Sequence, residues 1–231
     1  MNSTPFLYVA FKGLNDSMSG TLDGTKIESI KETINHYAIA SAVASTATGL
    51  LPGVASVIAA LTQAGFVWAT YIKINNTLGI SMSEHTAKFL GSAIVTNIVA
   101  NAGTILAGYA CAAIFSFIPI VGQVGSMAIN GAMGYIIIYV GAVVYLKLIS
   151  KLIQPDGTLV VEENDKTKHM IAEIIKQDNL NDIIKEGRNS YKSAKANGSI
   201  EQARNNPKCP NCGTDVKPGY KFCTECGSPL K

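Results

Sequence analysis

Four cysteines in the C-terminal tail have the residue type and spacing of a metal site. Cys209 and Cys212 form one Cys-x-x-Cys pair, and Cys223 and Cys226 form a second pair after a short spacer. Four thiolates on two such turns make a closed tetrahedral site for zinc, with no coordination position left for a substrate. We therefore predict that these four residues bind Zn2+ and that this metal is structural rather than catalytic.

The spacer between the two cysteine pairs is predicted to be a β-hairpin. It runs from Asp215 to Phe222 and carries the turn pair Pro218-Gly219 at its centre. Residues 207–231 are too few to fold without the metal. A redox role would need a single Cys-x-x-Cys beside a βαβ unit, and disulfides need an oxidising compartment, so we favour neither.

The tail sequence CPNCGTDVKPGYKFCTECGSPL resembles the short zinc-ribbon module that occurs at one end of many bacterial and archaeal membrane and regulatory proteins. The resemblance covers residues 207–231, and every ligand position of that module is present. It implies a small β-hairpin domain held together by one structural zinc.

Charge is scarce and unevenly distributed in the rest of the chain. The protein has 231 residues, of which 48% are hydrophobic and only 15% are charged, against roughly 25% in an ordinary soluble domain. No charged residue occurs between Glu32 and Lys73 or between Lys88 and Lys147. The net charge of +3 is too small to indicate a strongly basic nucleic-acid binder.

Each of the two uncharged blocks is predicted to form a helical hairpin. The first block is broken at Pro52 into residues 33–51 and 54–72, and the second, 89–146, is broken at Pro119. At about 1.5 Å per residue, each run approaches the roughly 30 Å of a bilayer core. We predict a mainly α protein with a four-helix membrane domain over 33–153. A buried core of a soluble all-α bundle is the alternative.

Positive charges predict the orientation in the membrane. The lysines that flank the blocks lie at the open ends of both hairpins, and the two turns carry no charge; these lysines are Lys31, Lys73, Lys88, Lys147 and Lys151. Because basic residues near spanning segments stay cytoplasmic, both termini are expected on the cytoplasmic side of the cytoplasmic membrane. Shallow hairpins that do not reach the far face fit the same pattern. The N-terminus lacks the apolar core of a secretory signal, so Met1 is expected to be the mature start.

The two hairpins also resemble each other. Tyr71-Ile-Lys-Ile74 matches Tyr145-Leu-Lys-Leu148, and the turn around Pro52 matches the turn around Pro119. These short matches predict an internal repeat.

A few polar side chains interrupt the apolar blocks, namely Asn97, Asn101, Gln123 and Asn130. At membrane depth each would need a partner. We expect them either to join helices or to line a conduction path. Cys111 is expected to be a small packing residue.

The remaining segments are polar. Residues 1–32 are predicted to be a loosely ordered arm, with a β-prone run at 6–11, followed by an amphipathic helix from Thr25. Residues 154–206 are predicted to hold amphipathic helices around Met170–Ile175 and Leu180–Ile184, and then a flexible linker from Lys192 to Asn206.

The sequences TGLLPGVASVIAALTQAG and FIPIVGQVGSMAING resemble the glycine-rich helical hairpin domain of unknown function that follows some bacterial Era-like GTPases. This resemblance covers roughly residues 30–152. The chain has no Gly-x-x-x-x-Gly-Lys-Ser/Thr loop, so nucleotide hydrolysis is not expected of it.

No arrangement typical of an enzyme occurs, since His36, His85 and His169 are scattered and match no catalytic motif. We therefore expect a non-enzymatic membrane adaptor that presents the ribbon to a cytosolic protein. A homo-oligomeric pore or membrane-inserting effector is the alternative from another class. Lysines flank the ribbon's aromatic residues, but they are too few to favour nucleic acid over protein; these lysines are Lys208, Lys217, Lys221 and Lys231.

Overall fold

The computed structural model describes residues 5–47, 55–115, 123–154, 156–177 and 179–205, together with residues 209, 214–216, 222 and 224 of the tail. These residues form eight helices and no strand, so the chain is mainly helical, as the sequence predicts. The helices are α1 (Pro5–Ser17), α2 (Gly24–Ala47), α3 (Ala55–Leu78), α4 (Glu84–Phe115), α5 (Gln123–Leu152), α6 (Asp165–Gln177), α7 (Leu180–Ala196) and α8 (Ser199–Asn205).

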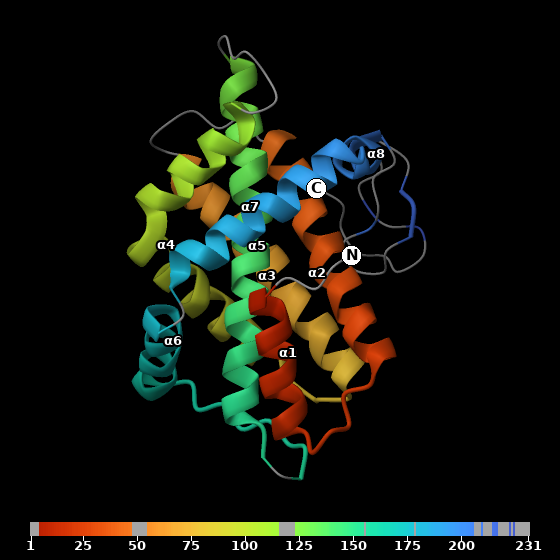
Figure 1. The fold of residues 1–231 in the computed structure, drawn as a ribbon, viewed down its shortest axis with the longest axis vertical. Helices are drawn as coiled ribbons and strands as arrows, with labels where there is room; N and C mark the ends of the chain where they lie inside the picture. The colour runs from red at the N-terminus through yellow and green to blue at the C-terminus, as the bar shows by residue number, and fades with distance from the viewer. Residues whose placement is uncertain are drawn as a thin grey trace.

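Helix α5 is the centre of the fold. It packs against α1, α2, α3, α4, α6 and α7, and it stands upright in the middle of Figure 1. From Gly131 to Ile149 nearly every side chain is buried. A helix that is apolar on all sides must be covered on all sides, and the surrounding helices provide that cover.

The described residues contain a single helical stretch that is long and apolar enough to cross a membrane. It is Asn130–Leu152 within α5, and 89% of its most apolar window is buried inside the protein. Because the core helix of a soluble protein has the same length and composition, this stretch is weak evidence for membrane crossing.

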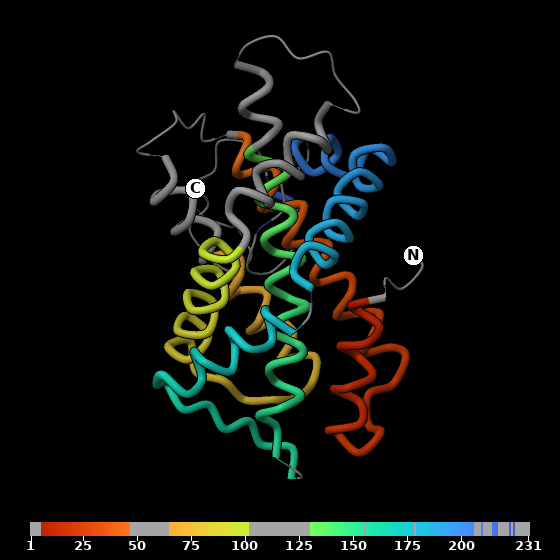
Figure 2. The backbone as a smooth tube through the Cα atoms, turned by 60° about the vertical axis from the view of Figure 1, so that its left-hand side comes forward, coloured from red at the N-terminus to blue at the C-terminus, as the bar shows by residue number. Residues whose placement is uncertain are grey.

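Helices α2 to α5 form two antiparallel pairs, α2 with α3 and α4 with α5 (Figures 1 and 2). The four helices cover the two predicted hairpins but extend past them: α2 and α3 begin and end at 24 and 78 instead of 33 and 72, and α4 and α5 at 84 and 152 instead of 89 and 146. Helix α2 thus includes the amphipathic helix predicted from Thr25. The turns at 48–54 and 116–122 lie outside the described residues. Helices α3 and α5 run in the same direction, and the rings of Tyr71 and Tyr145 stack with centroids 3.9 Å apart and planes 8° from parallel. The two matching segments of the predicted repeat therefore lie side by side.

Tyrosine hydroxyl groups connect α5 to its neighbours. Tyr135 donates to the side chain of Asn35 on α2 at 3.0 Å. Tyr145 donates to Asn75 Oδ1 on α3 at 2.7 Å, and the hydroxyl of Tyr71 donates in turn to the carbonyl of Gly141 at 3.0 Å. Buried hydroxyls need such partners, so these bonds fix the rotation of α5 relative to α2 and α3.

The prediction of a loosely ordered N-terminal arm is wrong for residues 5–17, because these residues form α1. Leu7, Phe11 and Leu14 recur at helical spacing and are buried against the rest of the protein. The β-prone composition of residues 6–11 is overridden by this contact with α5.

The predicted flexible linker at 192–206 is also largely helical. Helix α7 continues to Ala196, and α8 follows at Ser199. Tyr191, Ala194 and Ile200 are buried, so apolar contacts hold this polar segment on the bundle.

Two of the polar residues in the second block form side-chain hydrogen bonds within their own helix. The side-chain amide of Asn97 donates to the carbonyl of Ala93 at 2.9 Å, and that of Asn101 donates to the carbonyl of Asn97 at 2.8 Å. Both bonds lie within α4, one turn back along the same helix. Neither of these bonds joins two helices.

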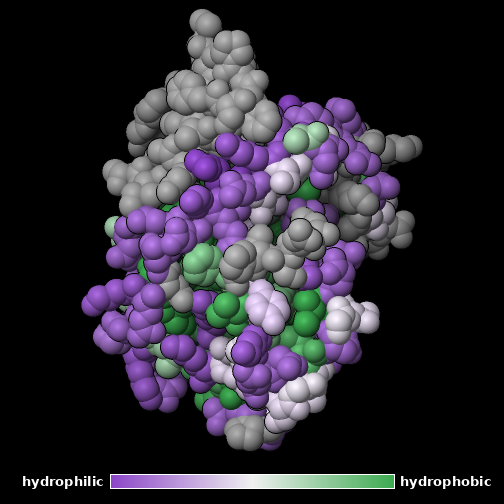
Figure 3. All heavy atoms as spheres, in the orientation of Figure 1, coloured by the Kyte–Doolittle hydropathy of each residue, from purple (hydrophilic) through white to green (hydrophobic). Residues whose placement is uncertain are grey.

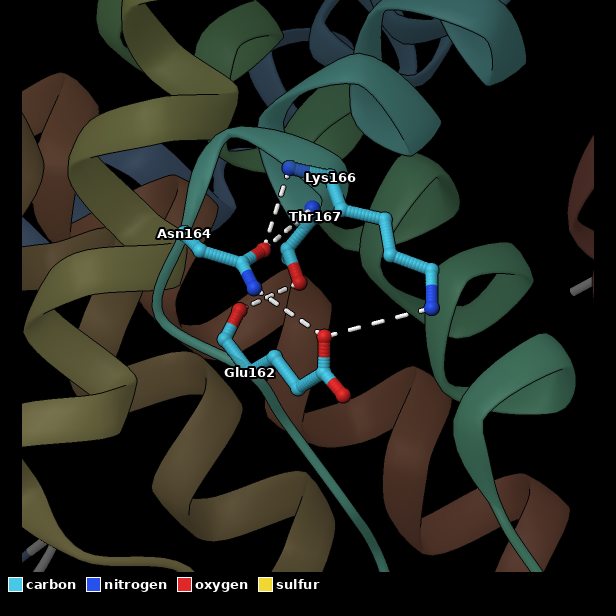
Figure 4. Close-up of polar contacts among 4 residues, drawn as sticks. All are labelled: Glu162, Asn164, Lys166 and Thr167. Carbon is cyan, nitrogen blue, oxygen red and sulfur yellow. Dashed lines mark hydrogen bonds and ion pairs between the residues drawn. The ribbon is translucent and has the colours of Figure 1, made fainter.

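The start of α6 is fixed by the residues that precede it (Figure 4). The side-chain oxygen of Asn164 accepts hydrogen bonds from the backbone N–H groups of Lys166 at 3.0 Å and Thr167 at 3.2 Å. This is the usual way to satisfy the open N–H groups of a helix start. Next to it, Glu163 accepts a hydrogen bond from Thr86 at 2.8 Å and lies 2.8 Å from Nε2 of His85, which ties this loop to α4.

Glycine at position 131 allows α5 to approach α2 closely. A Cβ atom there would lie 2.8 Å from the Thr46 side chain and 3.2 Å from the carbonyl oxygen of Ala42. We expect Gly131→Ala to lower the free energy of unfolding by about 1 to 3 kcal/mol, because the helices must separate or strain. Denaturant unfolding followed by circular dichroism measures this, and Gly24→Ala, whose Cβ meets open space, is the matched control. Equal stability of the two variants would contradict the close packing.

Glu186 on α7 is a buried carboxylate that packs against α5. It accepts a hydrogen bond from the Tyr139 hydroxyl at 3.1 Å, and its second oxygen, Oε2, is buried with no hydrogen-bond partner. Burial raises the pKa of Glu186, while the Tyr139 bond, the Phe6 backbone N–H and the charge of Lys147 oppose that rise. The packed protein therefore holds this proton more tightly than the unfolded chain does.

The stability that protonated Glu186 contributes is complete below the ordinary glutamate pKa of about 4.3 and is lost as the pH rises through the raised value. We expect Glu186→Gln, which carries no charge to bury, to be more stable than the wild type at pH 7 and about equal to it at pH 4. Thermal melts across this pH range measure the difference. Exposed Glu32→Gln should show no such trend, and a Glu186→Gln gain that is independent of pH would refute the explanation.

Candidate metal centre

The first predicted zinc ligand, Cys209, is buried and has no exposed surface. Its backbone N–H donates to the carbonyl of Thr214 at 2.8 Å. This bond joins the two sides of the first Cys-x-x-Cys pair, whose intervening residues lie outside the described part of the chain. A buried thiol fits a structural metal ligand.

The other three predicted ligands, Cys212, Cys223 and Cys226, lie outside the described residues. Within the part of the chain that the structure describes, no cluster of three His, Cys, Asp or Glu side chains could hold a metal. The donor chemistry is that of four thiolates, which suits zinc and leaves no open position. Cys111, by contrast, belongs to α4.

The predicted ligand Cys209 interacts electrostatically with Tyr37 of α2. Burial, with a smaller contribution from charge at Cys209, raises the pKa of Tyr37 on α2 to about 12. Helix α8, which ends four positions before Cys209, also packs against α2. His36 on the same helix places its ring edge-on to Tyr37, with centroids 5.3 Å apart. The spacing of residues in the sequence does not predict that Cys209 and Tyr37 interact.

The outer part of the ribbon carries an exposed aromatic side chain. Phe222 is 61% exposed, and both Asp215 and Phe222 lie in isolated β-bridges. This extended backbone fits the predicted hairpin, whose turn lies outside the described residues.

The three histidines lie on three different helices. His36 belongs to α2, His85 to α4 and His169 to α6. The imidazole of His85 is 84% exposed and pairs with Glu163. It therefore connects α4 at the surface to the loop that precedes α6.

Comparison with known proteins supports the zinc site. Residues 208–230 match the family described as zinc-ribbon domain. No curated protein and no solved structure matches the chain. The resemblance of residues 30–152 to the hairpin domain of Era-like GTPases finds no support in these comparisons. The family match agrees with a structural zinc and covers only the tail.

We expect the purified full-length protein to contain about one zinc per chain, because four thiolates complete one tetrahedral site. Cys209→Ser should lose most of this zinc, whereas Cys111→Ser should retain it. Mass spectrometry of total metal, together with colorimetric release by a thiol reagent, measures the content. Zinc loss in Cys111→Ser, or full retention in Cys209→Ser, would exclude the proposed ligand set.

Proposed function

We propose that the chain is a non-enzymatic membrane-anchored adaptor, whose uncharged hairpin ends hold it on the cytoplasmic membrane and whose zinc ribbon binds a cytosolic protein. The observation that carries this proposal is the separation of charge along the bundle. Lys31, Lys73, Lys88 and Lys147 lie in the halves of α2, α3, α4 and α5 that are nearer to Gly24, Leu78, Glu84 and Leu152 respectively. The opposite helix ends belong to sequence stretches without a charged residue.

The polar surface of the bundle limits how deeply it can enter a bilayer. Ser92, Thr96 and Asn101 are exposed along α4, and burying such groups in lipid is costly. Helix α7, with several charged residues, lies across α4 and α5. We therefore propose that only the uncharged hairpin ends around Pro52 and Pro119 enter the bilayer. This is the shallow form of the predicted hairpins, with both termini on the cytoplasmic side.

The uncharged ends have the composition needed for such insertion. Residues 115–121 read Phe-Ser-Phe-Ile-Pro-Ile-Val, and residues 50–54 read Leu-Leu-Pro-Gly-Val. Two apolar turns at one end of a bundle would anchor it by burying apolar surface in the outer part of a leaflet. The proposed bilayer contact thus uses both hairpins together.

The ribbon supports the adaptor half of the proposal. Its first ligand is buried close to α2, and Phe222 stays exposed. A closed zinc site offers no position for a substrate. An exposed aromatic residue with few surrounding lysines favours a protein partner over nucleic acid.

A soluble all-α protein is the second candidate. It is favoured by the burial of 89% of the most apolar window of α5 within the protein itself. In that case the uncharged hairpins are a core rather than an anchor. The two candidates differ in what the hairpin ends contact.

Membrane fractionation with an alkaline carbonate wash separates these candidates. We expect the wild type to stay in the pellet and the double variant Ile118→Lys/Ile120→Lys to move to the supernatant, because charge opposes insertion by several kcal/mol. Thr96→Lys, on the exposed face of α4, is the control and should remain in the pellet. Release of the wild type would favour the soluble protein, and release of Thr96→Lys would indicate deep spanning instead.

The adaptor half can be tested on the same membranes by chemical crosslinking. We expect Phe222→Ala to stay in the membrane but to lose a protein that crosslinks to the wild type, whereas Val160→Ala, at another exposed apolar residue, should keep it. An identical crosslinking pattern for Phe222→Ala and the wild type would refute the role of the ribbon surface.

A further inference from the structure

Helix α7 lies across both helices of the second hairpin, α4 and α5 (Figure 1). At its N-terminal end, Asn181 lines the same groove as Asn101 of α4. Toward its C-terminal end, the ring of Tyr191 lies edge-on to that of Tyr135 on α5, with centroids 5.7 Å apart. These two contacts locate α7 along the length of each helix of the hairpin.

The two contacts lie at similar distances from the uncharged end of the hairpin. Asn101 lies 14 residues before Phe115, where α4 ends, and Tyr135 lies 12 residues after Gln123, where α5 begins. At about 1.5 Å per residue, these separations are about 21 Å on α4 and about 18 Å on α5. Helix α7 therefore crosses the hairpin about 20 Å from its uncharged end, measured along either helix.

This distance matches the thickness of one lipid leaflet. A bilayer with its head groups is about 40 to 45 Å thick, so that one leaflet measures about 20 to 22 Å. The uncharged ends can enter a leaflet only until α7 reaches the bilayer surface, because moving its charged side chains into hydrocarbon is costly. The proposed anchor therefore places α7 at the level of the lipid head groups.

The outer side of α7 is polar and basic. Its outer row of residues, spaced three or four positions apart, contains two lysines and two asparagines and no acidic residue; the row consists of Asn181, Lys185, Asn189, Lys192 and Ala196. Figure 3 shows hydrophilic side chains over this part of the surface. The acidic residues of α7 are the buried Glu186 and Asp182 in its first turn, which accepts a hydrogen bond from Asn179 at 2.6 Å.

Lys185 and Lys192 supply the positive charge that a ligand can reach. Lys185 is exposed and Lys192 is half-buried, and neither forms an ion pair with another residue that the structure describes. Arg188 and Lys195 lie on the same side of α7 but already interact within the protein, so their charges are not counted. The two lysines are two helical turns apart, about 10 Å along the axis. This separation fits two neighbouring head groups of a lipid surface better than one small anion.

We infer, on the basis of the proposed membrane anchor, that the outer row of α7 binds the head groups of anionic phospholipids. A lysine is attracted to an anionic lipid surface only within about a Debye length of it, and the level at which α7 crosses the hairpin meets this condition. Side-chain amides such as that of Asn189 can donate hydrogen bonds to phosphate oxygens. Apolar insertion and attraction to anionic lipid add to each other in binding a protein to a membrane surface. The anchor thus combines the two uncharged hairpin ends with a basic helix at the surface.

Flotation of the purified full-length protein with lipid vesicles tests the inference. We expect the wild type to bind vesicles of phosphatidylcholine mixed with phosphatidylglycerol more tightly than vesicles of phosphatidylcholine alone. Lys185→Gln/Lys192→Gln should bind the mixed vesicles about 25-fold more weakly than the wild type, because each lysine near an anionic surface contributes about fivefold. The control is Lys73→Gln/Lys151→Gln, which removes the same charge from exposed positions in the opposite halves of α3 and α5 and should leave the affinity unchanged.

Two variants distinguish failure of the α7 surface from failure of the anchor. Lys185→Gln/Lys192→Gln should still bind phosphatidylcholine vesicles like the wild type, whereas Ile118→Lys/Ile120→Lys should lose this binding. Equal binding of the wild type to both kinds of vesicle, or equal losses in the two lysine-to-glutamine variants, would overturn the role of α7 and leave the anchor in place. Absence of wild-type binding to either kind of vesicle would overturn both.

Discussion

The enclosure of α5 is the constraint on which the rest of the structure depends. This helix belongs to a stretch of chain with no charge between Lys88 and Lys147, so it has no face that favours water. Six helices cover it. They include the polar helices α6 and α7, whose buried apolar residues lie on the sides that face the bundle. The amphipathic segments after residue 154 are therefore part of the body of the protein and complete its core.

Apolar contact alone would leave the rotation of such a helix poorly defined, because one apolar face packs much like another. The tyrosines of α5 define this rotation. Tyr135, Tyr139 and Tyr145 place their hydroxyls on polar groups of α2, α7 and α3 respectively. Each bond lies in a low-dielectric surrounding, where a misaligned hydroxyl would be left without a partner. The bonds thus select one arrangement among many with similar apolar burial.

Much of this fold could be predicted from the sequence, because its signals are local. The breaks at Pro52 and Pro119 located the four long helices, and the spacing of Met170 to Ile184 located α6 and α7. Helix α1 was missed, since residues 6–11 are β-prone and only their contact with α5 favours a helix. The uncharged blocks could not reveal their surroundings, because lipid and a protein core select the same apolar residues. Likewise, cysteine spacing predicts the metal ligands but not the electrostatic interaction between Cys209 and Tyr37, which joins segments far apart in the chain.

The connection between α8 and the ribbon has a mechanical consequence. Helix α8 ends at Asn205 and the first predicted metal ligand is Cys209, a separation that a fully extended chain spans with about 14 Å at most. A zinc ribbon on so short a connection begins close to the end of α8, whereas a module on a long flexible tether would search a larger volume. A protein that binds the ribbon as proposed would therefore also come close to α8.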